Sequence, residues 1–354
     1  MIAYPLLLEP QYDRKIWGGR RLQTVLGKAL PDTEPIGESL ESGDDAVVGN
    51  GPLAGRTLRE LVELDASGLL GARGLAASQP FCDFPLLVKF IDASAVLSLQ
   101  VHPDDEGACT RGKRGKTEAW YIVQGEPGAN LITGMSRLAD ADEVRASIAN
   151  GSFEDLLERR EVAGGECLVV PAGTVHAIGQ GVLLYEVQQN CDLTYRLYDW
   201  GRVDDRGNPR ELHLEDALTA LRPERHARPV APLRVDEWRE MLCACRYFAL
   251  ERWSIDGERG LLNASNSFRL ISCIQGAIGL HAPDMAPVEL ATGRTALLPA
   301  DLLEVALLGS GTLLCSYVPD LENDVVQPLL ASGHSRAEIA TLAGDTHNLA
   351  DTQR

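Results

Sequence analysis

Five polar residues in three separate stretches have the types and spacing of a metal site. Gln100 and His102 are two residues apart, as are Lys116 and Glu118, and His176 follows a Pro-x-Gly turn. On a β-strand, residues two apart point to the same face, so each pair can project into one interior. An amide oxygen, two imidazoles and a carboxylate suit Zn²⁺ and also accept Co²⁺, Mn²⁺ or Fe²⁺. Because water or substrate completes the coordination of such a set, the pattern predicts a catalytic metal site.

Further polar residues are spaced so that they can line the same interior. Glu186 and Gln188 alternate along one apolar run, so both side chains are expected on one face, where they can line the cavity or orient a ligand. Asp104, two residues beyond His102, can orient that histidine in the same way. Trp120 is expected to pack in the core.

Length, charge and cysteine content limit the classes of protein to consider. The chain has 354 residues, of which 45% are hydrophobic, enough for about two domains. A formal net charge of −18 predicts binding to neither nucleic acid nor anionic membranes, since these require clusters of Lys and Arg. The local exception is the basic run 111–116. No apolar run predicts a membrane span, the scattered cysteines indicate a reducing cytoplasm, and a monomer is the default expectation.

The predicted secondary structure is dominated by short strands. Runs rich in Val, Ile, Leu and Tyr lie between Gly, Pro, Asn and Asp, as in antiparallel barrels, and the clearest are 86–90, 95–101, 119–123, 166–170 and 182–187. Fewer helices are predicted, over 57–64 with Thr57 as N-cap, over 139–158 with a break at Asn150-Gly151, and over 325–330 and 336–342. The fold class is therefore expected to be mainly β with small helical insertions.

A turn motif occurs twice along the chain. In the first copy Pro171 precedes His176, and in the second Pro299 precedes Glu304 at the same spacing. Such a repeat predicts two barrels of similar design, the second without the histidine that would bind a metal. We therefore expect a catalytic domain over 1–235, a degenerate barrel over 236–320 and a helical tail over 321–354.

These stretches together resemble a known family. The shared residues are 10–12, 16–19, 36–39, 84–89, 97–105, 115–120, 171–176 and 185–202, and the block Gln100-x-His102-Pro103-Asp104 is the most specific of them. The chain is similar to the type I mannose-6-phosphate isomerases of the cupin superfamily, in their shorter bacterial form. The resemblance implies two cupin-type (jelly-roll) β-barrels and one Zn²⁺ per chain, held by Gln100, His102, Glu118 and His176. It also implies that Arg196 is the active-site arginine.

The implied reaction accounts for the other charged residues. Converting mannose 6-phosphate to fructose 6-phosphate moves a proton between C1 and C2 through an enediol, which requires positive charge near the developing enediolate. Zn²⁺ and Arg196 can supply that charge, so Arg196 is the predicted catalytic residue. Lys116 is the first candidate for the phosphate, followed by Arg202 and the run 111–116, and Glu186 is expected to line the substrate site.

Two other functions are compatible with part of this pattern. His102, Asp104 and His176 also form a two-histidine, one-carboxylate set of the kind found in non-haem iron oxygenases, although this leaves Gln100 and Glu118 without a role. A non-catalytic sugar-phosphate-binding cupin would retain the pocket without turnover. The intact ligand set argues against the second alternative.

Overall fold

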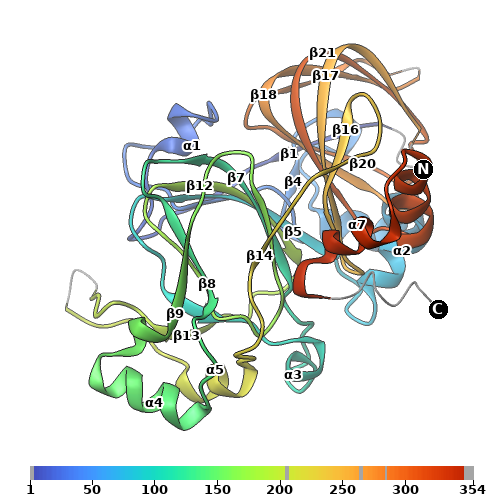
Figure 1. Cartoon of the computed structure of the whole chain (residues 1–354). Coiled ribbons are helices and arrows are strands. Elements are labelled where there is room, and N and C mark those ends of the chain that lie inside the picture. Colours follow the sequence, from blue (N-terminus) through green and yellow to red (C-terminus); the bar gives the residue numbers. More distant parts are fainter. Residues whose placement is uncertain (1–3, 204–206, 263–265, 284, 347–354) are drawn as a thin grey trace.

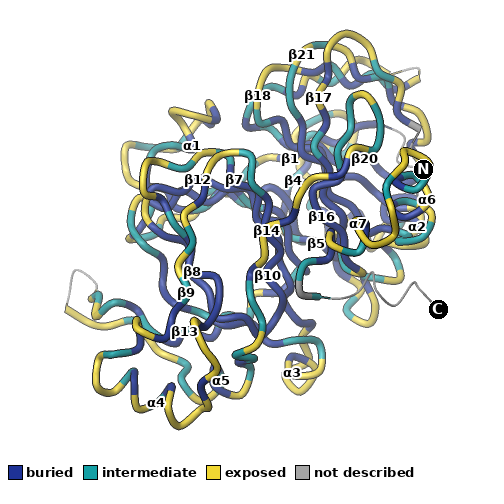
Figure 2. Tube along the Cα trace, viewed as in Figure 1, coloured by how far each residue is buried: buried dark blue, intermediate teal, exposed yellow. Residues whose placement is uncertain are grey.

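Two antiparallel β-structures, each enclosing its own apolar interior, make up most of the chain (Figure 1). The computed structural model describes residues 4–203, 207–262, 266–283 and 285–346. Figure 2 shows that the buried parts of the trace follow the central strands of both structures. This architecture confirms the predicted mainly β class. Within the described ranges, no helix is long and apolar enough to span a membrane.

The first β-structure contains a seven-stranded sheet opposed by shorter strands. The sheet has the order β14 (Arg228–Val230), β10 (Cys167–Val170), β7 (Glu118–Gly125), β12 (Val182–Gln189), β5 (Leu86–Ala93), β3 (Glu38–Leu40) and β2 (Gln11–Asp13). The opposing strands are β11 (Ala177–Ile178), β8 (Asn130–Met135) and β9 (Leu157–Glu161), with the pair β13 (Tyr195–Tyr198) and β6 (Leu99–Val101). Trp120, Leu131, Ile178 and Leu184 pack together between these layers, which closes a barrel.

The second β-structure is a nine-stranded sheet built mainly from the last third of the chain. Its order is β15 (Leu233–Arg234), β16 (Arg239–Ala244), β17 (Ala249–Leu262), β21 (Glu304–Tyr317), β18 (Arg269–His281), β20 (Thr295–Leu298), β1 (Leu6–Glu9) and β4 (Val47–Val48), with β19 (Val288–Ala291) paired to β18. The strands β1 and β4 therefore join a sheet far from them in sequence. The domain boundaries at 235 and 320 stay predictions, and the sheet pairing adds that both ends of the chain contribute to the second β-structure.

The repeated turn motif corresponds to the same local structure in both barrels. Strand β10 ends immediately before Pro171, and strand β20 ends immediately before Pro299. After the first turn the chain forms β11, and after the second it forms β21. His176 is buried at the end of the first turn, whereas Glu304 at the corresponding place is exposed to solvent. The second barrel thus retains the turn without an inward-facing metal ligand at that position.

The helices cover the ends and the outer edges of the sheets. They are α1 (Arg21–Thr24), η1 (Gly51–Leu53), α2 (Leu58–Ser78), α3 (Asp105–Cys109), α4 (Ala141–Asn150), η2 (Phe153–Leu156), α5 (Leu214–Ala220), η3 (Leu321–Val326), α6 (Gln327–Ala331), α7 (Arg336–Ala340) and η4 (Thr341–Thr346). The tail elements after Asp320 bury Val325, Leu329 and Ile339 in the core of the second β-structure. The tail therefore packs as part of that domain up to residue 346, and the rest of the predicted tail lies outside the described residues.

Some predicted boundaries differ from the structure. Thr57 caps helix α2 with a capping box as expected, but the helix continues to Ser78 through non-helical residues at Asp65 and Gly71. The strand predicted over 95–101 begins only at Leu99, and the helix predicted over 139–158 ends at Asn150, where Gly151 adopts a left-handed conformation. Residues 157–161 form strand β9 instead. In each case, pairing or packing with a distant segment decided the conformation.

Candidate metal centre and active site

The long strands of the first barrel place a row of polar side chains on its inner face. In the register of β7 and β12, Glu118 lies opposite Gln188, and Trp120 lies opposite Glu186. In the next pair, Glu186 lies opposite Lys89 of strand β5. Residues directly opposite each other on neighbouring strands share one face of a sheet. The alternation of Glu186 and Gln188 in the sequence is thereby matched by residues on two adjacent strands.

The opposing wall brings the other predicted residues together through backbone contacts. Gln100 exchanges two backbone hydrogen bonds with His176, of 3.0 and 3.1 Å, and pairs on its other side with Arg196 of strand β13. The carbonyl of His102 accepts a 2.8 Å hydrogen bond from the amide of Gly173. Gly173 has a φ of +89°, which explains why glycine stands in this turn. Gln100, His176 and Arg196 therefore occupy directly opposite positions on three neighbouring segments.

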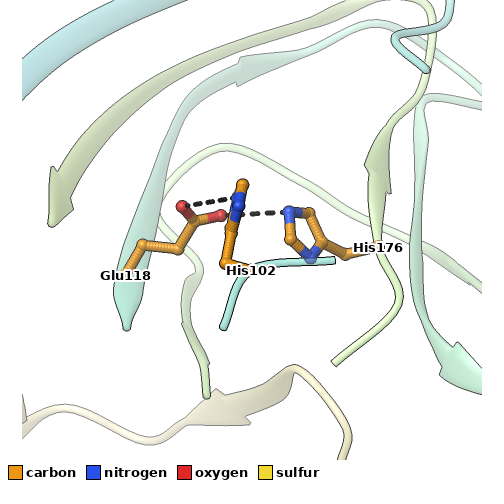
Figure 3. Close-up of side chains that lie close together, drawn as sticks. All are labelled: His102, Glu118 and His176. Carbon is orange, nitrogen blue, oxygen red and sulfur yellow. Dashed lines mark ion pairs between the residues drawn. The ribbon is translucent and has the colours of Figure 1, made fainter. Parts of the chain in front are cut away.

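Three side chains from these two walls meet in the barrel interior (Figure 3). The Nε2 atom of His102 lies 3.5 Å from Oε2 of Glu118, and the Nε2 atom of His176 lies 3.3 Å from Oε1 of the same carboxylate. The ligand atoms of the three residues all lie within 4.8 Å of one another, and all three residues are buried. This is the geometry of a possible three-residue metal site.

The hydrogen bonds of the two imidazoles test whether the cluster fits a cation. The Nδ1 atom of His102 contacts the Leu193 carbonyl at 2.9 Å, and that of His176 contacts the Thr174 carbonyl at 2.9 Å. Because a carbonyl only accepts hydrogen bonds, both Nδ1 atoms carry the proton and both Nε2 atoms present a lone pair to the cluster. Neither Nε2 atom has a hydrogen-bond partner, nor does Oε2 of Glu118. Buried polar atoms are normally paired, so these residues fit a metal ion.

The electrostatics of the cluster favour neutral imidazoles. Burial lowers the pKa of His102 well below its usual value, and the neighbouring Lys116 lowers it further. Burial also lowers the pKa of His176 to about 4. Burial raises the pKa of Glu118 to about 7, although the ammonium group of Lys116 acts in the opposite direction. A divalent cation at this position would favour the ionised carboxylate and use the lone pairs of both neutral rings.

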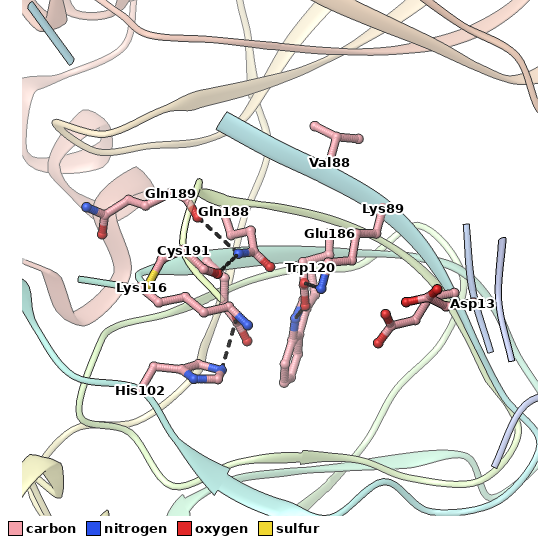
Figure 4. A network of polar contacts seen from close by, with 12 residues as sticks. Asp13, Val88, Lys89, His102, Lys116, Trp120, Glu186, Gln188, Gln189 and Cys191 are labelled. Carbon is pink, nitrogen blue, oxygen red and sulfur yellow. Dashed lines mark hydrogen bonds and ion pairs between the residues drawn. The ribbon is translucent and has the colours of Figure 1, made fainter. Parts of the chain in front are cut away.

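Two buried lysines alternate with the carboxylates beside the cluster. The Nζ atom of Lys116 lies 3.2 Å from Oε2 of Glu118. Figure 4 shows Lys89, Glu186 and Trp120 meeting on the neighbouring strands: Nζ of Lys89 lies 3.5 Å from Oε1 of Glu186, whose Oε2 accepts a 2.8 Å hydrogen bond from the indole of Trp120. Burial raises the pKa of Glu186, but Lys89 and Lys116 outweigh this effect and lower it.

Lys89 is the residue that the sequence analysis did not assign to the site. Burial alone would lower its pKa, but Glu186 and Glu38 raise the pKa above the usual lysine value, so the side chain is charged. A lysine in the apolar run 86–91, two residues from the buried Phe90 neighbours, was the signal available in the sequence. Its partner Glu186 cannot be identified from sequence spacing, because the two strands are far apart in the chain.

The predicted arginines occupy different environments. Arg196 donates from Nε to the buried Ser98 hydroxyl at 3.3 Å and from Nη1 to the Glu211 carbonyl at 2.8 Å, beside Gln100 on the barrel wall. Arg202 contacts the carboxylate of Asp199 and the carbonyl of Val96. The structure thus places Arg196 next to a predicted ligand and holds Arg202 in a separate ion pair.

The basic run 111–116 is divided among several acidic partners. Arg111 contacts Asp216, Lys113 contacts Asp192, and the buried Arg114 contacts Asp83. These contacts do not form a single anionic-ligand patch.

Asp104 has a different role from the one expected. Its Oδ1 accepts from the amide of Gly107 as the N-cap of helix α3, and its Oδ2 lies 3.9 Å from Arg222. The expectation that Asp104 orients His102 is therefore wrong, because the Leu193 carbonyl contacts that ring. The carboxylate that accompanies His102 and His176 is Glu118, which removes the geometric basis for an oxygenase triad that includes Asp104.

The barrel and its buried His-Glu-His cluster define a cupin protein with a candidate metal site. Residues 6–121 match the family described as phosphomannose isomerase type I, catalytic domain, and residues 239–318 match mannose-6-phosphate isomerase, cupin domain. The chain is 36% identical over 328 residues to a mannose-6-phosphate isomerase of Bacillus subtilis, covering 90% of this chain and 100% of that protein. A mannose-6-phosphate isomerase of Streptococcus mutans is 36% identical over 283 residues, covering 78% of this chain and 86% of that protein.

The solved structures agree with the sequence matches. A crystal structure of the mannose 6-phosphate isomerase from Bacillus subtilis superposes with a TM-score of 0.79 at 33% identity, covering 88% of this chain and 99% of that chain. An isomerase from Salmonella typhimurium, at 16% identity and a TM-score of 0.70, shows the shared fold. The chain belongs to the type I phosphomannose isomerases, a family of aldose–ketose isomerases.

Proposed function

We propose that this chain is a zinc-dependent enzyme that interconverts mannose 6-phosphate and fructose 6-phosphate. The observation that carries the proposal is the set of buried, unpartnered atoms formed by Nε2 of His102, Nε2 of His176 and Oε2 of Glu118. Gln100 is the proposed fourth ligand, because its backbone pairs directly with His176. A bound Zn²⁺ would supply a Lewis acid for the oxygens of the sugar.

The remaining residues have roles that follow from their charge and position. Arg196 is the proposed catalytic cation: it lies beside Gln100 and can stabilise negative charge as the proton moves between C1 and C2 through an enediol. Lys116 is the proposed phosphate or sugar-oxygen ligand, and Arg202 would reach the substrate only if its guanidinium left Asp199. The carboxylate of Glu186 retains one unpartnered oxygen, Oε1, which can accept from a substrate hydroxyl.

A coupled assay for conversion of mannose 6-phosphate to fructose 6-phosphate tests the proposal. The purified protein is assayed as prepared, after chelation, and after zinc is added back. We expect turnover to disappear on chelation and to return with zinc. A folded, zinc-loaded protein without turnover would refute the catalytic proposal and leave a sugar-phosphate-binding cupin.

Two variants separate metal binding from catalysis. His176→Ala is expected to lose zinc and activity together, because it removes a proposed ligand. Arg196→Ala is expected to retain zinc and to lose about 10²-fold or more in kcat, as for removal of a group that stabilises transition-state charge. Equal loss of zinc from both variants would show that the role of Arg196 is assigned wrongly.

We also propose a cytoplasmic, monomeric enzyme whose partner is the sugar phosphate rather than nucleic acid or a membrane. The support is that all eight cysteines are free thiols and that the net charge is −18. Sedimentation at several protein concentrations tests the monomer, with a concentration-dependent mass as the contrary result.

A further inference from the structure

The hairpin between β16 and β17 brings two residues of the second β-structure to the edge of the first. A backbone hydrogen bond of 2.9 Å from Cys245 to Phe248 closes the hairpin and leaves Arg246 and Tyr247 at its tip. The Tyr247 hydroxyl donates to Oδ2 of Asp105 at 2.6 Å, and Arg246 donates to the same oxygen at 3.0 Å. Asp105 is the first residue of helix α3, close in sequence to the proposed ligand His102.

The other oxygen of Asp105 holds the segment that leads to Glu118. Its Oδ1 accepts from the amide of Gly115 at 2.9 Å and from the side chain of Gln189 at 3.0 Å. The carbonyl oxygen of the same Gln189 side chain accepts from the amide of Thr117 at 3.0 Å. Thr117 lies between Lys116 and Glu118, so the chain of contacts from the hairpin tip ends at the backbone of the site.

The segment is packed without space for adjustment at Gly115. A Cβ atom added there would lie 2.5 Å from the backbone nitrogen of Asp105, so only glycine permits this approach. The amide of Lys116 donates to the Pro103 carbonyl at 3.0 Å in the same region. The position of Lys116 therefore depends directly on where Asp105 lies.

Apolar packing contributes little to the contact between the tip and Asp105. Cavities of about 800 and 370 Å³ lie next to it, and Asp105, Arg246 and Tyr247 line both of them. Burial raises the pKa of Asp105, but hydrogen bonds from Tyr247 and Gln189 outweigh it and lower the pKa, so the carboxylate is ionised at neutral pH. Charge-assisted hydrogen bonds of this kind are about twice as strong as neutral ones.

We propose that Tyr247 and Arg246 of the second β-structure are positioning residues for the metal centre, acting through Asp105 and Gln189 on the segment that carries Lys116 and Glu118. The proposal rests on the proposed function for its kinetic consequence, although its effect on metal binding can be measured without turnover. The degenerate barrel then has a task in the site, in addition to its contribution to stability.

The test is a set of single and double variants in the full-length chain. Tyr247→Phe removes only the hydroxyl group, and Asp105→Ala removes the acceptor for all the contacts described above. Tyr4→Phe is the matched control, because it removes a hydroxyl that donates to the Asn50 carbonyl at 3.2 Å in a different part of the molecule. Zinc affinity is measured by competition with a chelator, and kcat and KM are measured at saturating zinc.

We expect Tyr247→Phe to bind zinc about 10-fold more weakly, which is the scale found for groups that orient metal ligands. At saturating zinc, kcat should fall while KM changes less, and hydrogen exchange should increase over residues 105–118 in the zinc-free protein. In the Asp105→Ala background, Tyr247→Phe should have no further effect. Tyr4→Phe should leave zinc affinity and kcat at the wild-type values.

Wild-type zinc affinity in a folded Tyr247→Phe variant would overturn the proposal, as would additive effects in the double variant. If Tyr247→Phe does not fold, Gln189→Leu gives the same comparison from the other end of the contact chain. If the wild-type protein binds zinc but does not isomerise mannose 6-phosphate, the proposed function fails, whereas the positioning proposal is still decided by zinc affinity.

Discussion

A buried ion pair between Lys28 and Glu41 links the N-terminal part of the chain to the second β-structure. The Nζ atom of Lys28 lies 2.7 Å from Oε1 of Glu41, and both side chains are 1% exposed. Lys28 also donates to the Gly293 carbonyl at 2.5 Å, and Oε2 of Glu41 accepts from the Thr295 hydroxyl at 2.9 Å. Burial lowers the pKa of Lys28, and the adjacent Glu41 acts in the opposite direction. The pair is therefore an ionised contact that has lost almost all its hydration.

Removing one partner should destabilise the protein far more than removing both. Lys28→Met leaves a buried carboxylate without its cation, which costs about 3–5 kcal/mol. Replacing both with apolar residues of similar size, as in Lys28→Met with Glu41→Leu, is often neutral or stabilising, apart from about 1 kcal/mol for the lost hydroxyl contact with Thr295. The double variant should therefore be at least about 2 kcal/mol more stable than the Lys28→Met single variant.

Urea unfolding, followed by tryptophan fluorescence and circular dichroism, measures these differences. Arg59→Met is the control, because the Arg59 side chain is 46% exposed in its ion pair with Asp44. Exposed pairs contribute about 0–1 kcal/mol, so this variant should change the free energy of unfolding little. A Lys28→Met effect no larger than that of the control, or a double variant less stable than the single one, would refute the reasoning.

Three further outcomes follow from single contacts. Asp104→Ala should cost about 1 kcal/mol through loss of the N-cap of α3 yet retain zinc on metal titration, and loss of the metal would revive the oxygenase arrangement. Trp120→Phe removes the indole donor to Glu186, so kcat should fall while a zinc titration still reaches one equivalent, and unchanged kcat would show that this contact is unimportant. Tyr185→Phe removes a buried 2.8 Å contact with Ser316 across the two β-structures, and it should lower the free energy of unfolding in urea by about 1–3 kcal/mol without changing KM, whereas a shifted KM would indicate an effect on the site.

The sequence determined those features that depend on local spacing. The period-two pairs Gln100/His102 and Lys116/Glu118 indicated inward-facing residues because side chains alternate along a strand. The Pro-x-Gly turn before His176 was recognisable because few residues other than glycine adopt a positive φ. The mainly β class and the two-barrel design followed from the same local patterns and from the resemblance.

Only the tertiary structure decided which distant residues meet. The register of β5 and β12 brings Lys89 to Glu186, and the hairpin at Tyr247 reaches Asp105, although no sequence pattern relates either pair. Strand β1 likewise joins β20, at the opposite end of the chain. Such contacts depend on strand register and on the packing of one domain against another, where long-range burial outweighs local preference. Local spacing thus specified the ligand types, whereas the fold supplied the charges and hydrogen bonds around them.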